Sequence, residues 1–168
     1  MPNRASFDDY DDAMLFTTGT PAGLRFGPNA PTSDVFGVYG GQGNRGTTDF
    51  IAYCWAEIEG FSKFGSYIGN GSTDGPFVYC GFKPAFVLVK SSTNSSNWLI
   101  MDNARNSINP VDLDLYANLS NTETEYDRFD YVSNGFKVRN TSGEMNTDGA
   151  TYIFMAFAES PFQTANAK

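Results

Sequence analysis

The sequence contains no histidine, and this absence removes several kinds of chemistry at once. Ser-His-Asp and Cys-His catalysis need an imidazole as proton acceptor, and imidazole is also a common zinc ligand. Cysteine is scarce as well, because Cys54 and Cys80 are the two thiols of the 168-residue chain. Two thiols without histidine make neither a disulfide framework nor a metal site, so we expect no metal and no other cofactor. We expect Cys54 to be a small buried apolar residue.

Basic residues are few: 11 Lys and Arg stand against 19 Asp and Glu, for a formal net charge of −8. Binding to phosphates needs clustered Lys and Arg, so nucleic acid is not an expected partner. The chain has no run of 18 apolar residues, and we therefore expect no membrane insertion. Residues 1–12 lack the basic and apolar regions of a signal peptide, which favours arrival by assembly over classical secretion.

Aromatic residues and glycines are plentiful, with 15 Phe, 9 Tyr and 17 Gly. Short apolar runs alternate with Asn-Gly, Asp-Gly and Ser-Gly turn signals, and no segment has a convincing helical period. The clearest strand is Phe82 to Lys90, which has a β-branched middle and a lysine at its end. This pattern predicts an all-β protein with little or no helix, an antiparallel β-sandwich of the jelly-roll or concanavalin-A-like kind.

One strand-like segment is written twice, at residues 50–57 and 152–159, which align without a gap. Each copy is an apolar, aromatic run closed by a glutamate, and this pattern predicts a buried strand in both places. Residues 58–76 are expected to form an aromatic and glycine-rich linker loop. The repeat thus indicates an N-terminal β segment or half-domain at 1–57 and a main β-sandwich at 77–168. One continuous sandwich over 13–162 is the alternative.

Two neighbouring carboxylates, Glu57 and Glu59, are the candidates for acid–base chemistry. On one face of a strand they would lie roughly 6 to 7 Å apart, within the range of glycosidase carboxylate pairs. The second copy of the strand keeps only Glu159, next to Ser160 and Pro161. We therefore favour a structural role for these glutamates and predict no catalytic residue.

Two sets of residues are candidates for binding. An exposed aromatic side chain together with Asn and Asp on loops is typical of sugar sites. The candidates are Trp98 with Asn97, and the loop residues Asn146 and Asp148. Core packing of Trp98 and a turn role for Asp148 are the alternatives. Aromatic residues in the 58–76 segment indicate an interface with a neighbouring subunit, and these are Phe61, Phe64 and Tyr67.

Several stretches together resemble an uncharacterised domain family of marine tailed bacteriophages, including cyanophages. The stretches that carry the resemblance are Ala52–Tyr67, Gly69–Tyr79, Gly81–Val87, Asn134–Arg139 and Tyr152–Phe162. In these phages the domain is typically found at the C-terminal end of large tail or fibre proteins, often after concanavalin-A-like lectin modules.

The resemblance implies a virion structural protein, with no catalytic or ligand residues to carry over. We expect a tail fibre or tail-associated host-recognition component, not an enzyme, assembled in the host cytoplasm and located in the virion. Other virion proteins and further copies of the chain are the expected partners, as a trimer in a fibre, and a host surface glycan is another candidate. Capsid decoration or a head fibre is one alternative, a carbohydrate-binding lectin a second, and a carboxylate glycanase a third.

Overall fold

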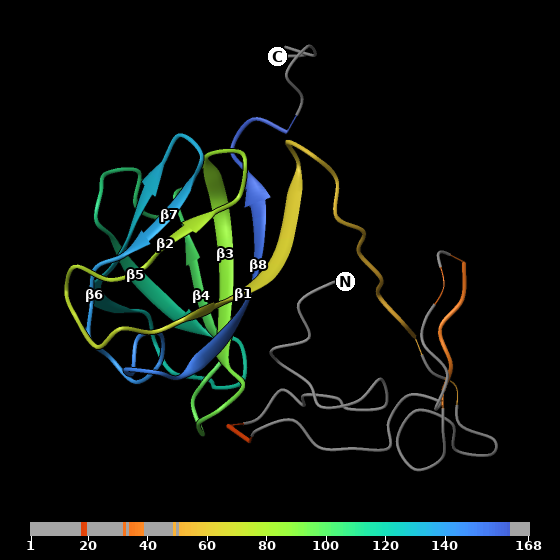
Figure 1. The fold of residues 1–168 in the computed structure, drawn as a ribbon, viewed down its shortest axis with the longest axis horizontal. Helices are drawn as coiled ribbons and strands as arrows, with labels where there is room; N and C mark the ends of the chain where they lie inside the picture. Colours follow the sequence, from red (N-terminus) through yellow and green to blue (C-terminus); the bar gives the residue numbers. More distant parts are fainter. Residues whose placement is uncertain (1–17, 20–31, 33, 39–48, 50, 162–168) are drawn as a thin grey trace.

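A computed structural model of the chain describes residues 18, 19, 32, 34–38, 49 and 51–161. These residues contain eight strands and no helix (Figure 1). The strands are β1 (Ser62–Ile68), β2 (Phe77–Tyr79), β3 (Pro84–Ser91), β4 (Leu99–Asp102), β5 (Val111–Tyr116), β6 (Thr124–Val132), β7 (Gly135–Val138) and β8 (Thr151–Ala158). Each paired strand runs antiparallel to its neighbour, so the all-β antiparallel prediction is confirmed. Over the same ranges, no helix has the length and apolar character needed to span a membrane.

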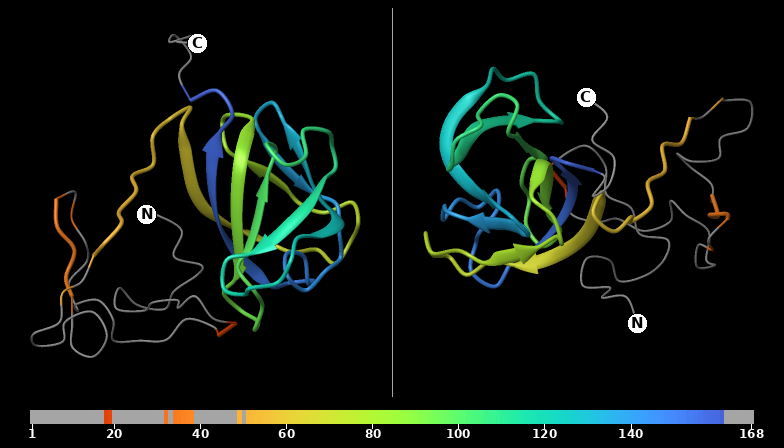
Figure 2. Two further views of the ribbon diagram at one scale, coloured as in Figure 1. Left: turned by 180° about the vertical axis from the view of Figure 1, so that it is seen from behind. Right: turned by 90° about the horizontal axis from the view of Figure 1, so that it is seen from above.

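The eight strands form one sheet in the order β1-β8-β3-β4-β5-β6-β7-β2. Strands β3 to β7 follow one another as a meander, whereas β8 returns to lie between β3 and β1. The sheet curls until its opposite halves face one another across a shared core, and Figure 2 shows this ring from above. The two end strands, β1 and β2, face each other across a seam that no ladder of hydrogen bonds closes. The result is a nearly closed barrel.

The core follows the two-residue alternation of β strands. In β8 the side chains of Tyr152, Phe154 and Ala156 are buried, while the residues between them are partly exposed. Edge-to-face aromatic contacts join opposite parts of the barrel, with Phe136 and Phe154 ring centroids 5.5 Å apart. Burial of each such large apolar side chain contributes about 1.5 to 3 kcal/mol, so this interior is the main source of stability.

Strand β1 lies inside the segment that was predicted to be a linker. It pairs with β8 along its whole length, from Ser62 opposite Phe157 to Ile68 opposite Thr151. The serines and Gly65 of this strand weaken its β signature, because neither residue type packs well on a pleated surface. The prediction that residues 58–76 form a linker loop is therefore wrong over β1. This segment is a strand because it pairs with β8, although its own residues give little indication of one.

The first copy of the repeated strand also differs from its prediction. Residues 51–57 are extended but belong to no strand, and Ile51, Tyr53 and Trp55 are 81, 75 and 58% exposed. Cys54 is exposed too, contrary to the prediction that it is buried. The second copy, β8, is paired on both edges and forms part of the core. A domain boundary at residue 57 stays a prediction, because most of residues 1–50 lies outside the described residues.

Candidate functional site

The seam between the two end strands contains a slot of about 480 Å³. It is lined by Lys63, Phe64, Gly65, Ser66 and Tyr67 of β1, Phe77, Val78 and Tyr79 of β2, and Phe154. Gly65 has no side chain to fill it, and a Cβ there would lie 3.0 Å from Cε1 of Phe154. The slot is therefore lined by aromatic side chains and lies between two sheet edges. The edges suit an extended peptide segment, and the rings suit an aromatic group.

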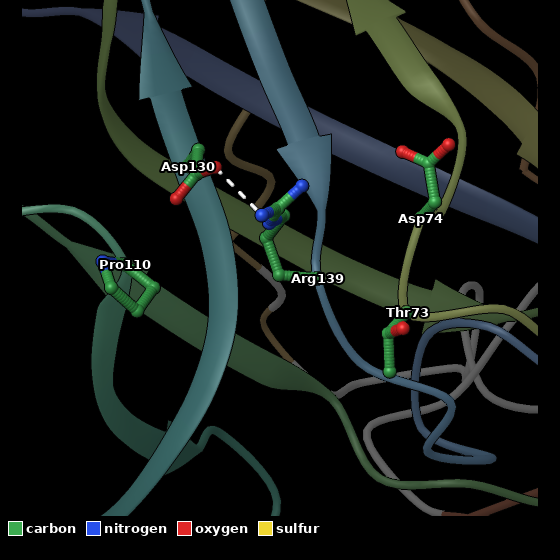
Figure 3. Close-up of a pocket in the computed structure, with 5 residues that line it drawn as sticks. All are labelled: Thr73, Asp74, Pro110, Asp130 and Arg139. Atoms are coloured by element: carbon green, nitrogen blue, oxygen red, sulfur yellow. Dashed lines mark ion pairs between the residues drawn. The ribbon is translucent and has the colours of Figure 1, made fainter.

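A second pocket, of about 640 Å³, is lined by charged and polar side chains (Figure 3). Arg139 Nε lies 3.2 Å from Asp130 Oδ2, and Lys137 Nζ lies 2.7 Å from Asp74 Oδ1. The hydrogen bond from Lys137, followed by its positive charge, holds the pKa of Asp74 below its usual range. Each of the two carboxylates is thus paired with a basic side chain. This arrangement suits hydrogen bonding to a polar ligand better than proton transfer.

The predicted sugar platform at Asn97 and Trp98 is mostly covered. Trp98 is 9% exposed, as its alternative role in core packing implies, and its backbone N–H donates to Asn118 Oδ1 at 2.9 Å. Asn97 donates from its backbone and its side chain to the carboxylate of Glu144, at 2.7 and 3.1 Å. These contacts tie the entrance of β4 to the loop before β8, and they leave little of the indole face for a sugar ring.

The other two predicted ligand residues lie in that same loop, but they have different environments. Asn146 is fully buried, and its amide nitrogen donates to Asn70 Oδ1, Ser72 O and Asn140 O at 3.2, 2.7 and 2.9 Å. Its amide oxygen accepts the backbone N–H of Asn70 at 2.8 Å. Asp148 is exposed. Asn146 therefore holds two loops together, and a sugar-binding role for Asp148 stays a prediction.

The three predicted interface aromatics separate onto two faces of the sheet. Tyr67 is in the core, where its hydroxyl donates to Met145 O at 2.8 Å, so its prediction as a subunit contact is wrong. Phe61 and Phe64 are half-buried on the outer face, each 6.1 Å from the ring of Phe157. Phe86 also contacts Phe157, at 6.0 Å. Phe86 and Phe157 were not predicted to lie on this outer face. The alternation of these residues with core residues in β3 and β8 could have indicated it.

The carboxylate pair proposed for glycoside cleavage is not arranged on one strand face. Glu59 lies in a turn, and Glu57 forms an ion pair with Lys63, with Oε1 and Nζ 2.5 Å apart. Both line a pocket of about 390 Å³ together with Cys80, a thiol whose burial raises its pKa to about 12. Such a thiol is not a nucleophile at neutral pH. Among the described residues, no group of three or more His, Cys, Asp or Glu side chains could hold a metal ion.

The fold and these surfaces define the protein as a small antiparallel all-β barrel domain with an open seam. The chain belongs to the family described as a domain of unknown function (DUF7483), which matches residues 10–161. The match spans all eight strands of the barrel. No curated protein and no solved structure matches the chain.

Proposed function

We propose that this protein is a bacteriophage virion structural protein, a tail fibre or tail-associated host-recognition component that acts by binding and assembly. The resemblance of several stretches to an uncharacterised domain family of marine tailed phages supports the virion assignment. The observation that carries the binding role is the aromatic lining of the seam. Phe64 is half-buried there, and Phe77 and Tyr79 are 47 and 63% exposed.

Exposed aromatic side chains of this kind are typical of contact surfaces. They bury a large apolar area at a small cost in side-chain entropy, and the tyrosine hydroxyl adds a polar contact. Phe77 and Tyr79 alternate with the buried Val78, so the short strand β2 holds both rings on the outer face. Two aromatic rings held side by side on one strand form a surface that best fits a second protein chain.

The charged groups support binding rather than catalysis in this proposal. Glu57, Asp74 and Asp130 each form an ion pair with a basic side chain, so these carboxylates already take part in contacts that hold the surface together. The net charge of −8 favours solubility and discourages association with nucleic acid.

Carbohydrate binding is a second candidate, and the polar pocket favours it. Thr73, Asp74, Asp130 and Arg139 offer donors and acceptors around about 640 Å³, a suitable size and chemistry for sugar hydroxyls. A glycan array should then show binding that is lost in Asp130→Ala and kept in Asp112→Ala, a matched acidic residue outside that lining. Equal binding by both variants would remove this pocket as the sugar site.

Two experiments test the main proposal. Immunogold labelling of intact virions should place the protein on the tail, whereas labelling of the head favours the capsid-decoration or head-fibre alternative. Absence of the protein from purified virions would overturn the assignment. Light scattering of the full chain should detect an oligomer that Tyr79→Ser dissociates and Tyr126→Ser preserves. Tyr126 is the matched control because it is 55% exposed on β6, away from the seam.

A further inference from the structure

The chain begins a hairpin on the open edge of β1 and stops after one pair of residues. Ile58 N donates to Ser62 O at 3.3 Å, and Ser62 N donates to Ile58 O at 2.9 Å. Gly60 allows the turn between them with a φ of 74°. The Ser62 hydroxyl donates to Ala56 O at 2.8 Å and accepts Ile58 N–H at 3.1 Å. A tight turn is thus already formed between β1 and the segment before it.

The backbone groups of β1 can accept a further strand on this edge. Successive residues of an antiparallel strand direct their N–H and C=O groups to opposite edges. Phe61 O accepts from Ala158 N and Gly69 N donates to Ala150 O, so the odd-numbered positions face β8. The backbone N–H and C=O groups of Phe64 and Ser66, like those of Ser62, point to the other edge, where the sheet ends. That edge offers a row of donors and acceptors to an incoming strand.

The pair formed by Ile58 and Ser62 sets the register of any continuation. Each residue further towards the N-terminus from Ile58 would pair with the residue one position further along β1 from Ser62. The first pair of this register is present, since Glu57 Oε1 lies 2.5 Å from Lys63 Nζ. The further pairs would be Ala56 with Phe64, Trp55 with Gly65, Cys54 with Ser66, and Tyr53 with Tyr67.

The side chains of residues 51–57 suit this register. Large residues, Ile51, Tyr53 and Trp55, alternate with the small residues Ala52, Cys54 and Ala56, so that a strand here would have all its large side chains on one face. The rings of Tyr53 and Trp55 already lie on one side, with centroids 6.4 Å apart and planes 29° apart. This large face is exposed in the structure.

The register directs that large face towards the slot. Residues opposite each other in an antiparallel pair point to the same side of the sheet. Tyr67 points into the core, and Gly65 of the same parity lies against Phe154. Trp55 would therefore meet the position where β1 has no side chain, at the slot of about 480 Å³.

We propose that residues 51–57 pair with the open edge of β1 of their own chain as an additional strand that covers the seam. The structure then represents the open form, in which this segment leaves the end of β1 and diverges from the barrel (Figure 1). Closure transfers the aromatic side chains of Tyr53 and Trp55 from water to the slot, and it pairs an edge that would otherwise be available to another chain. The inference does not depend on a role in the virion.

A cysteine pair tests the register directly in the full-length chain. The proposed strand places the native Cys54 opposite Ser66, at about the 5.5 Å Cα separation that a disulfide accepts. With oxidised glutathione as the oxidant, Ser66→Cys should form a bond between residues 54 and 66 of one chain. Peptide mapping should find this link, and non-reducing gels should show a monomer. Cys80 is 5% exposed and is not expected to compete.

The matched control is Ile68→Cys, on the same edge and outer face but two residues out of register with Cys54. It should form the intrachain bond roughly tenfold more slowly, because the Cβ atoms would not face each other. Equal rates for the two variants, or no bond in Ser66→Cys, would overturn the proposed register. A disulfide that links two chains would overturn closure within the chain and assign the strand to a second copy.

Discussion

Tyr67 and Tyr152 stack inside the barrel, with ring centroids 5.3 Å apart and planes 16° apart. They are direct partners across β1 and β8, and both hydroxyls reach the loop between β7 and β8. Tyr67 donates to Met145 O at 2.8 Å, and Tyr152 donates to Gly143 O at 2.9 Å. The stacked pair thus connects the end strand of the sheet to the loop that contains Asn146.

Burial gives Tyr67 a pH-dependent contribution to stability. Desolvation, followed by the neighbouring Tyr152, raises the pKa of Tyr67 well above its usual value. The folded state therefore holds the neutral phenol, while the unfolded chain ionises near pH ~10. The contribution of Tyr67 is fully present below pH ~10 and is lost as the pH rises further. Urea unfolding between pH ~8 and ~11 should show a falling free energy of unfolding.

In Tyr67→Phe the decline above pH ~10 should be shallower, because one ionisable group no longer titrates in the unfolded chain. The variant should also lose about 1 to 2 kcal/mol at neutral pH, since Met145 O loses its donor. Tyr126→Phe, at a 55% exposed position on β6 away from the seam, is the control and should keep the wild-type profile. If the free energy of unfolding fell equally steeply with pH in the two variants, burial of Tyr67 would not be the cause of the decline.

Asn146→Ala should lower the free energy of unfolding by about 2 to 4 kcal/mol. The substitution removes the four hydrogen bonds that a fully buried amide makes to Asn70, Ser72 and Asn140. Chemical denaturation measures the effect. Asp148→Ala, at an exposed position two residues along, should change stability by less than about 0.5 kcal/mol. A small effect of Asn146→Ala would show that solvent can replace these bonds.

The buried ion pair of Asp114 and Arg128 should be far more sensitive than an exposed one. Arg128 Nε lies 3.0 Å from Asp114 Oδ2, and both residues are almost fully buried. Asp114→Ala leaves the guanidinium uncompensated and should cost about 3 to 5 kcal/mol in unfolding free energy. Lys83→Ala, which breaks the exposed pair with Glu159, should cost less than about 1 kcal/mol. Similar losses in the two variants would mean that water reaches Arg128.

The two thiols should differ in reactivity in the folded protein. Cys54 is exposed, whereas Cys80 is buried and has a pKa raised to about 12. Titration with a thiol reagent should therefore count one thiol in native protein and two in denaturant. Cys54→Ala should remove the native signal. Rapid labelling of Cys80 in native Cys54→Ala protein would show that the barrel opens near β2.

The parts of the fold that could be predicted are those with strong local signals. The β-branched run of β3 and the alternation of Leu99 and Met101 with their neighbours identify a strand and its core face. Strand β1 lacks such a signal, since serine and glycine occupy positions that β8 pairs and covers. Its assignment depends on a partner about 90 residues away in the chain, as Phe64 opposite Met155 illustrates.

The candidate sites were predictable to a smaller extent. Aromatic residues around the seam could be identified as a group, but the division between Tyr67 inside and Phe64 outside follows from strand parity in β1. Asn146 carries a turn signal, and nothing local indicates that Asn70, Ser72 and Asn140 surround its amide. The ion pairs of Asp74 and Asp130 likewise depend on how β7 lies beside β2 and β6.

The sequence by itself determined the all-β class and the alternation that makes one face of each strong strand apolar. It also contains two nearly equivalent strands, at 50–57 and 152–159, and does not distinguish them. The tertiary structure buries the second between β1 and β3 and leaves residues 51–57 exposed. The physical reason is that a strand is stabilised by the partners on its edges and the layer against its face. Those partners come from distant parts of the chain.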